Sequence, residues 1–266
     1  PLAPACVEAG GARARTWSGR GTPRDRCRAA TRLPGSARPA WFGALALALL
    51  GAAGCTPYVE GNGVYHEEDR TPAETFTGVR IQDGIEATVT SGAAQQKVVV
   101  SGDANIVKDY VKTEIVSDQG SGPVLHVRVA SGGGTVDPSL PLRVRVELAE
   151  LRYVHAGGDS HVKATGVATL LLKTEARGKS SVLVMGAGGG RIEVVASDSS
   201  VDAASYPVAE GALVDLSSGA RAELHSAGAV AGTVRGGCTL ENFGDGLCHG
   251  VVVPVGETAT ILCPVP

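Results

Sequence analysis

The chain has 266 residues, of which 37 are Gly and only 4% are aromatic, so small aliphatic side chains must build its core. Residues 1–54 hold eight of the 24 basic residues and two of the 27 acidic ones, which leaves residues 55–266 with a net charge of −9. Because binding to phosphates requires clustered positive charge, this balance argues against a nucleic-acid partner.

The N-terminal segment has the features of an export signal. Residues 1–39 are rich in Arg, Pro, Ala and Gly without apolar periodicity, and we expect a disordered leader or an over-extended start. Residues 40–55, AWFGALALALLGAAGC, form an apolar run of signal-peptide length that is short for a membrane span. The small residues before Cys55 resemble the bacterial lipobox, although Ala52 stands where that pattern usually has Leu. This resemblance implies a lipid anchor on Cys55; ordinary signal-peptidase cleavage and an uncleaved anchor are the alternatives.

The next segments predict a linker followed by strands. Residues 56–74 are polar, with Gly, Pro and charge, and are expected to be a linker between the lipid and the domain. From Phe76 onward, short runs such as FTGVRI, GIEATVT and PVLHVRVA are typical of strands. In LPLRVRVELAEL, Val144 and Val146 alternate with Arg143 and Arg145, which predicts a strand with one buried face.

Internal repeats predict the architecture of residues 75–266. The segments GDSHVKATG, GKSSVLVMG and SDSSVDAAS place Val162, Val182 and Val201 in equivalent positions, 20 and 19 residues apart. Weaker copies follow at 218–226 and 236–244. A strand–turn–strand–turn period of about 20 residues is typical of a solenoid, in which stacked coils share one thin core. The prediction is an all-β, right-handed β-helix or β-solenoid domain with a Cys-containing C-terminal cap; an antiparallel β-sandwich is the alternative.

These residues resemble the putative auto-transporter adhesin, head GIN domain family over roughly residues 75–240. The resemblance rests on FTGVRIQDGIEATVTSG, VVVSGDANIV and VLHVRV, followed by the Ser-x-Val repeats. The matching positions are Phe76, Val79, Ile81, Gly84, Ile85, Val89, Gly102, Asp103, Asn105, Leu125, Gly158, Ser160, Val162, Ser180, Val182, Ser200 and Val201. The resemblance implies a secreted or lipid-anchored bacterial domain of stacked β-coils, and it carries no catalytic residues.

Three of the six cysteines lie near the C-terminus, and an exported protein meets the oxidising conditions in which disulfides form. We expect Cys238 to pair with Cys248 around a short loop, with Cys248–Cys263 as the alternative. Either bond would close the last open coil.

No pattern in the sequence predicts catalysis, a metal site or a cofactor. The histidines lack ligand spacing, although His155 and His161 lie across an expected turn and could approach each other. Asp159 and Asp198 occupy related corners, but Lys179 holds the corner between them, which would interrupt a row of acids.

These observations favour a non-enzymatic envelope lipoprotein that presents a β-solenoid surface for binding or structure. It would lie in the periplasm or at the cell surface, with a slight preference for the outer membrane. We expect the membrane to hold it through Cys55, with an envelope protein or a glycan as a further partner. The alternatives are a polysaccharide-active enzyme on a β-helix scaffold and a self-assembling envelope scaffold.

Overall fold

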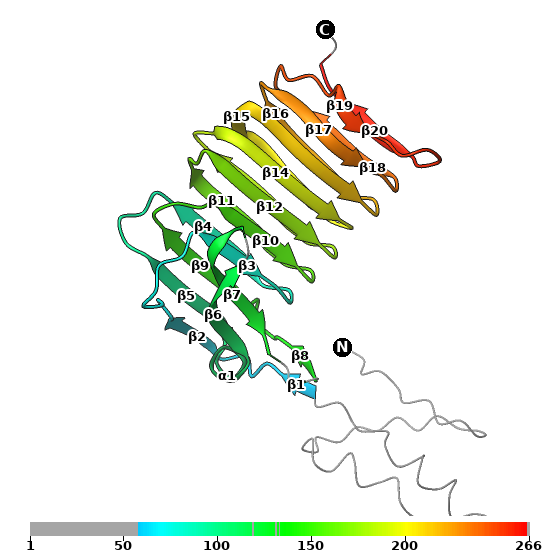
Figure 1. The fold of residues 1–266 in the computed structure, drawn as a ribbon. Helices are drawn as coiled ribbons and strands as arrows, with labels where there is room; N and C mark the ends of the chain where they lie inside the picture. The colour runs from blue at the N-terminus through cyan, green and yellow to red at the C-terminus, as the bar shows by residue number, and fades with distance from the viewer. Residues whose placement is uncertain (1–57, 119, 131, 133, 265–266) are drawn as a thin grey trace, which may run out of the picture. The chain divides into compact units, whose positions relative to one another are not determined.

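The computed structural model describes residues 58–118, 120–130, 132 and 134–264 (Figure 1). The predicted leader, the signal segment and the lipidation candidate Cys55 lie outside the described residues. Residues 57–266 form a compact unit of their own. No described helix is both long and apolar enough to cross a membrane.

The strands of this unit form two main layers, which we call sheet 1 and sheet 2. The long strand β15 (Ser200–Ser217) contributes to both layers: its residues 200–208 belong to sheet 2 and its residues 211–217 to sheet 1. In spatial order, sheet 1 contains β6 (Val111–Asp118), β7 (Gly122–Val129), β3 (Gly78–Ile81), β10 (Tyr153–Gly157), β12 (Leu171–Arg177), β14 (Gly189–Ser197), the second part of β15, β17 (Ala229–Val234) and β19 (Gly250–Val252). Sheet 2 contains β2 (Tyr65–Asp69), β5 (Lys97–Asp103), β9 (Arg143–Leu148), β4 (Glu86–Ser91), β11 (His161–Val167), β13 (Ser181–Gly186), the first part of β15, β16 (Arg221–Ser226), β18 (Cys238–Asn242) and β20 (Ala259–Leu262).

From β10 to β20 the chain alternates between the two sheets and makes six successive coils, each paired in parallel with the next. Figure 1 shows these coils stacked in chain order. Parallel pairing between coils is the arrangement of a solenoid, whereas an antiparallel sandwich would pair consecutive strands. The β-solenoid prediction is therefore confirmed.

The repeat register predicted from the sequence is the register of sheet 2. Val162 pairs with Val182, and Val182 pairs with Val201, each with at most 2% of its surface exposed. In the weaker copies, the equivalent positions are Ala222 and Leu240, both fully buried. A continuous column of small aliphatic side chains thus fills the interior, which explains how a chain with few aromatic residues builds a core.

Tight corners connect sheet 1 to sheet 2. At five of these corners, two consecutive residues have φ between +57 and +74°: Asp83–Gly84, Gly158–Asp159, Gly178–Lys179, Ser218–Gly219 and Gly236–Gly237. This left-handed conformation is easy for Gly and tolerable for Asp, which accounts for the recurrent Gly and Asp of the repeats. Lys179 is the long side chain in this set.

The N-terminal end of the stack is built differently from the repeats. Strands β2 and β5 extend sheet 2 in antiparallel pairing, and β6 extends sheet 1 in the same way. The short helix α1 (Ala104–Asp109) follows β5 and buries Ile106 and Val107 in the core. This helix covers the core at that end.

The prediction of a linker at 56–74 was wrong for residues 58–69. β1 (Tyr58–Glu60) pairs in parallel with β8 (Thr135–Asp137), and β2 joins sheet 2. The buried carboxylate of Asp103 organises this region, because it accepts hydrogen bonds from the amides of Gly63 (2.7 Å) and Leu140 (2.8 Å). The strands that pair with β1 and β2 lie far along the chain, so the polar composition of residues 58–69 did not indicate that they form strands.

Candidate functional site

An open groove of about 610 Å³ lies on the outer face of sheet 2, at the end nearest the N-terminal strands. Its walls and floor come from six strands: β2, β5, β9, β4, β11 and β13. The side chains with functional groups that line it are Tyr65, Glu67, Glu86, Thr88, Ser101, Arg143, Arg145, His161, Lys163 and Ser181.

Strand pairing places these side chains in two rows that run across the strands. In the first row, Arg143 pairs with Glu86, Glu86 with His161, and His161 with Ser181. In the second row, two positions further along each strand, Arg145, Thr88, Lys163 and Leu183 are in register. Alternate residues of a strand point to the same face, so the apolar residues between these positions enter the core while the rows face solvent.

Ion pairs orient the two arginines that line the groove. Arg143 Nε lies 3.0 Å from Glu86 Oε2, and Arg145 Nη2 lies 3.6 Å from Glu67 Oε1. Both arginine side chains remain more than half exposed, so they are oriented without being removed from solvent.

Lys163 is the uncompensated cation of the groove. Within the described residues it makes no ion pair, and its neighbours in register are Thr88 and Leu183. The adjacent His161 contacts the hydroxyl of Ser181 through Nδ1 at 2.7 Å. The groove can therefore present hydrogen-bond donors and a positive charge to a ligand.

The charge changes sign further along the same row. Beyond Leu183, the register continues through Asp202, Glu223 and Glu241. Arg221 contacts two of these acids, Glu223 at 2.8 Å and Glu241 at 3.5 Å. The second row thus carries the cations Arg145 and Lys163 within the groove and the acids Asp202, Glu223 and Glu241 on the later coils.

A second polar row crosses the outer face of sheet 1. It runs from Glu114 through His126, Arg80 and His155 to Glu175, one residue from each of five neighbouring strands. His155 is 7% exposed, and its Nδ1 lies 3.2 Å from Glu175 Oε2. This row is a half-buried network of charged and polar side chains rather than an open site.

The network shifts the pKa values of its members. The pKa of Glu175 is lowered to about 2, chiefly because His155 donates a hydrogen bond to the carboxylate, with Lys173 adding a second. The same contact with Glu175 raises the pKa of Lys173. Burial lowers the pKa of His126, whose Nε2 lies 2.7 Å from Gln82 Oε1. Such a pattern is that of a structural ion-pair network, in which the charged form of Glu175 is favoured.

The histidines and acids singled out from the sequence are not brought together. His155 belongs to β10 in sheet 1, whereas His161 belongs to β11 in sheet 2, and each is in the outward-facing row of its own sheet. Asp159 and Asp198 lie two corners apart, and Lys179 occupies the corner between them. The amide of Asp159 donates to the carbonyl of Gly178, and the amide of Lys179 donates to the carbonyl of Asp198. No described group of three or more His, Cys, Asp or Glu side chains is arranged to hold a metal.

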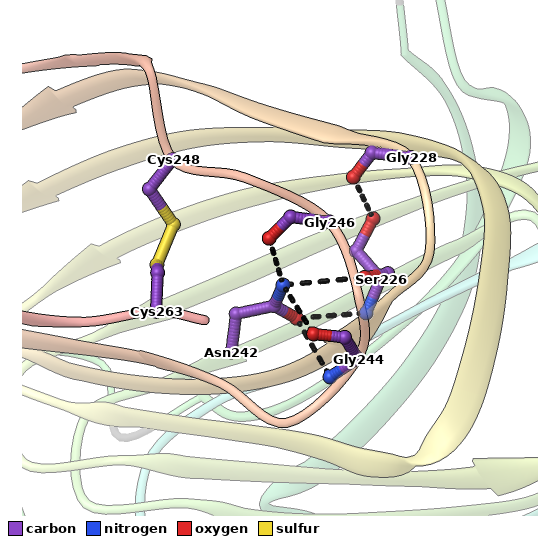
Figure 2. The surroundings of a disulfide bond; sticks show 7 residues. All are labelled: Ser226, Gly228, Asn242, Gly244, Gly246, Cys248 and Cys263. Carbon is purple, nitrogen blue, oxygen red and sulfur yellow. Dashed lines mark hydrogen bonds between the residues drawn. A yellow bond between two sulfur atoms is a disulfide. The ribbon is translucent and has the colours of Figure 1, made fainter. Parts of the chain in front are cut away.

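The expected disulfide between Cys238 and Cys248 was wrong; the bond joins Cys248 to Cys263, with Cα atoms 6.1 Å apart (Figure 2). Cys238 is fully buried as a free thiol, and its Sγ donates to the carbonyl of Arg235. The strand register places Cys238 at the corner position that Ser180 and Ala220 occupy in earlier coils. Cys238 therefore acts as a small corner side chain that points into the stack, while Cys248 and Cys263 flank the last two strands.

Comparison with known proteins agrees with this fold. The sequence model of the family described as putative auto-transporter adhesin, head GIN domain, matches residues 75–201. No curated protein matches the chain.

Two solved structures are similar to this chain. A putative adhesin from Bacteroides fragilis NCTC 9343 is 13% identical, with a TM-score of 0.59 over 77% of this chain and 100% of its own. A putative adhesin from Parabacteroides merdae ATCC 43184 is 15% identical, with a TM-score of 0.47 over 77% and 95%. At these identities the likeness to the first structure shows the fold alone. Residues 75–201 are therefore similar in sequence to the head GIN domain of the putative auto-transporter adhesin family, and the first solved structure shows that the described part of the chain has the same type of fold.

Proposed function

We propose that the protein is a non-enzymatic, adhesin-like lipoprotein of the cell envelope that binds an acidic saccharide polymer in the groove of sheet 2. Cys55 would carry the lipid that holds the domain at the membrane. The observation that carries the proposal is the composition of the groove, which combines an exposed aromatic ring with oriented cations and hydroxyl groups.

A saccharide suits this surface because its hydroxyls need both donors and acceptors. Arg143 and Arg145 supply donors, their partners Glu86 and Glu67 supply acceptors, and the ring of Tyr65 is 64% exposed. An aromatic face can stack on the apolar side of a sugar ring while the polar groups bind its edge. The width of six strands favours a polymer over a small ligand.

An acidic saccharide suits it better than a neutral one because of Lys163. This cation has no ion pair among the described residues, in a domain whose overall charge is strongly negative. The acids Asp202, Glu223 and Glu241 on later coils would repel a polyanion, which confines its contact to the groove.

The test compares a carboxylated polysaccharide with the same polymer after reduction of its carboxyl groups, both titrated against the full chain. We expect Lys163→Met to weaken binding of the carboxylated polymer about five-fold, equivalent to about 1 kcal/mol, and to leave the reduced polymer unaffected. Lys108→Met removes the same charge from helix α1, outside the groove, and should change neither affinity. Tyr65→Ala should weaken both polymers.

Other results would redirect the proposal. Equal binding of both polymers would remove the acidic requirement but keep the saccharide, and retention of an envelope protein instead would replace the saccharide altogether. Because Glu67 and Glu86 line the groove, the same incubations should also be examined for new reducing ends. Shortening of the polymer would favour the polysaccharide-active enzyme over the binding module.

A further inference from the structure

The last coil of the solenoid leaves apolar surface exposed. Five of the exposed large apolar side chains in the described part of the chain lie between residues 243 and 262: Phe243, Val252, Val253, Val255 and Leu262. Core-facing residues are also uncovered there, since Ile261 is only partly buried whereas its register partner Leu240 is fully buried. Among the described residues, no element like helix α1 packs over the core at this end.

The two terminal strands also have a free backbone edge. Strand β19 pairs with β17 and β20 pairs with β18, and no register joins either strand to a further one among the described strands. Their sequences, GVV and ATIL, contain no charged residue. Natural edge strands usually carry charges or a cover that prevents pairing with another chain, so an uncharged open edge is a pairing surface.

The opposite end of the stack is protected in the usual way. Strand β2 has the sequence YHEED and presents Glu67, Glu68 and Asp69, and helix α1 buries Ile106 and Val107 over the core. An acidic, covered end does not complement an apolar, uncharged one, which argues against head-to-tail stacking of copies. Strands β19 and β20, in contrast, are compatible with a second copy of themselves because neither strand carries a charge that would meet its like.

The disulfide holds this edge in shape. Cys248 precedes β19 and Cys263 follows β20, so the bond ties together the two ends of the terminal coil, one beside each sheet. A fixed edge loses little conformational freedom when it pairs.

We propose that a second copy of this chain covers the C-terminal edge and forms a twofold dimer through β19 and β20. A twofold axis perpendicular to both sheets reverses strand direction, so β19 would pair antiparallel with β19 of the second copy, and β20 with β20. Both sheets would then continue from one copy into the other, and the two exposed ends of the core would close on each other. The same symmetry places sheet 2 of both copies on one side of the dimer, with their grooves facing the same way.

The test measures the mass of the full chain by light scattering and sedimentation over a concentration series. We expect a dimer whose Kd rises at least about ten-fold in Thr260→Lys, which introduces a charge at the edge. Thr239→Lys is the matched control, because Thr239 is the register partner of Thr260 one coil earlier and is flanked on both sides. It should leave the Kd unchanged.

Hydrogen exchange separates this contact from any other. In the wild type, amides of β19 and β20 should become more protected as concentration rises, and circular dichroism should show that both variants keep the fold. A monomer at every concentration would overturn the proposal, as would a dimer that both variants weaken equally or that neither weakens. None of these results depends on whether the groove binds a saccharide.

Discussion

The side-chain amide of Asn242 bonds to both backbone polar groups of Ser226, in the preceding coil (Figure 2). The amide of Ser226 donates to Asn242 Oδ1 at 2.8 Å, and Asn242 Nδ2 donates to the carbonyl of Ser226 at 3.2 Å. Asn242 Nδ2 also donates to the carbonyls of Gly244 and Gly246. A buried side chain thus replaces strand pairing where the chain turns towards the last coil.

Replacing Asn242 with Leu should therefore destabilise the domain. Leu would match its apolar register partner Leu224, but it would leave the amide of Ser226 without its acceptor. We expect a loss of about 3 kcal/mol in the free energy of unfolding, measured in urea. The neighbouring exposed Phe243→Leu should cost less than about 0.5 kcal/mol; an equal loss in both variants would contradict the role of the amide.

Reduction of the Cys248–Cys263 bond should loosen the last coil specifically. The bond closes a loop with a sequence separation of 15, for which the stabilisation is about 3 kcal/mol. In Cys263→Ser, hydrogen exchange should accelerate in β19 and β20 and stay unchanged in β10 to β13. Cys238→Ser is the control, because Ser180 occupies the equivalent corner; it should keep the disulfide, and peptide mapping of the wild type should find Cys238 as a thiol.

Replacing Lys179 with Gly should stabilise the domain. Lys179 has a φ of +59°, a conformation that costs a residue with a Cβ about 1–2 kcal/mol relative to Gly. Part of this gain is offset by the larger entropy of Gly in the unfolded chain, so we expect about 1 kcal/mol in urea unfolding. Lys97→Gly, at the first position of strand β5, should be destabilising; a loss of stability in Lys179→Gly would show that the side chain of Lys179 makes a compensating contact.

The network around Glu175 should make stability depend on pH in acid. The pKa of Glu175 falls from 4.5 to about 2 on folding, so its charged form stabilises the native state. This contribution is present above about pH 4.5 and is lost as the pH falls towards 2. We expect wild type to exceed Glu175→Gln by about 2 kcal/mol at pH 6, with the difference shrinking below pH 4.5. A difference independent of pH would show that size or shape, rather than charge, sets the role of Glu175.

The repeats were predictable from the sequence because each coil carries its own copy of the signal. The column from Val162 to Val201 and the left-handed corners both follow from local residue types at a regular spacing. The corner position of Cys238 was also predictable, because GGC aligns with GDS and GKS in the earlier repeats. The short loop between Cys238 and Cys248 instead favoured a disulfide between these two residues.

The groove was not predictable in the same way. It depends on β2 and β5 pairing antiparallel beside β9, and these strands lie far apart along the chain and outside the repeats. Nothing local distinguishes Tyr65 or Lys163 from any other exposed strand residue. Only the register of six strands brings them to one surface.

Stacking in units of one coil also makes the length of this molecule adjustable. The coils between β14 and β18 lie between the groove and the terminal edge, and each bonds only to its two neighbours, so adding or deleting one such unit of about 20 residues would leave the groove and the terminal edge each with its own contacts. Such a change would move the edge relative to the groove by one strand spacing, about 4.8 Å. The distance between the two surfaces is therefore a property that duplication of a single coil can change in fixed steps.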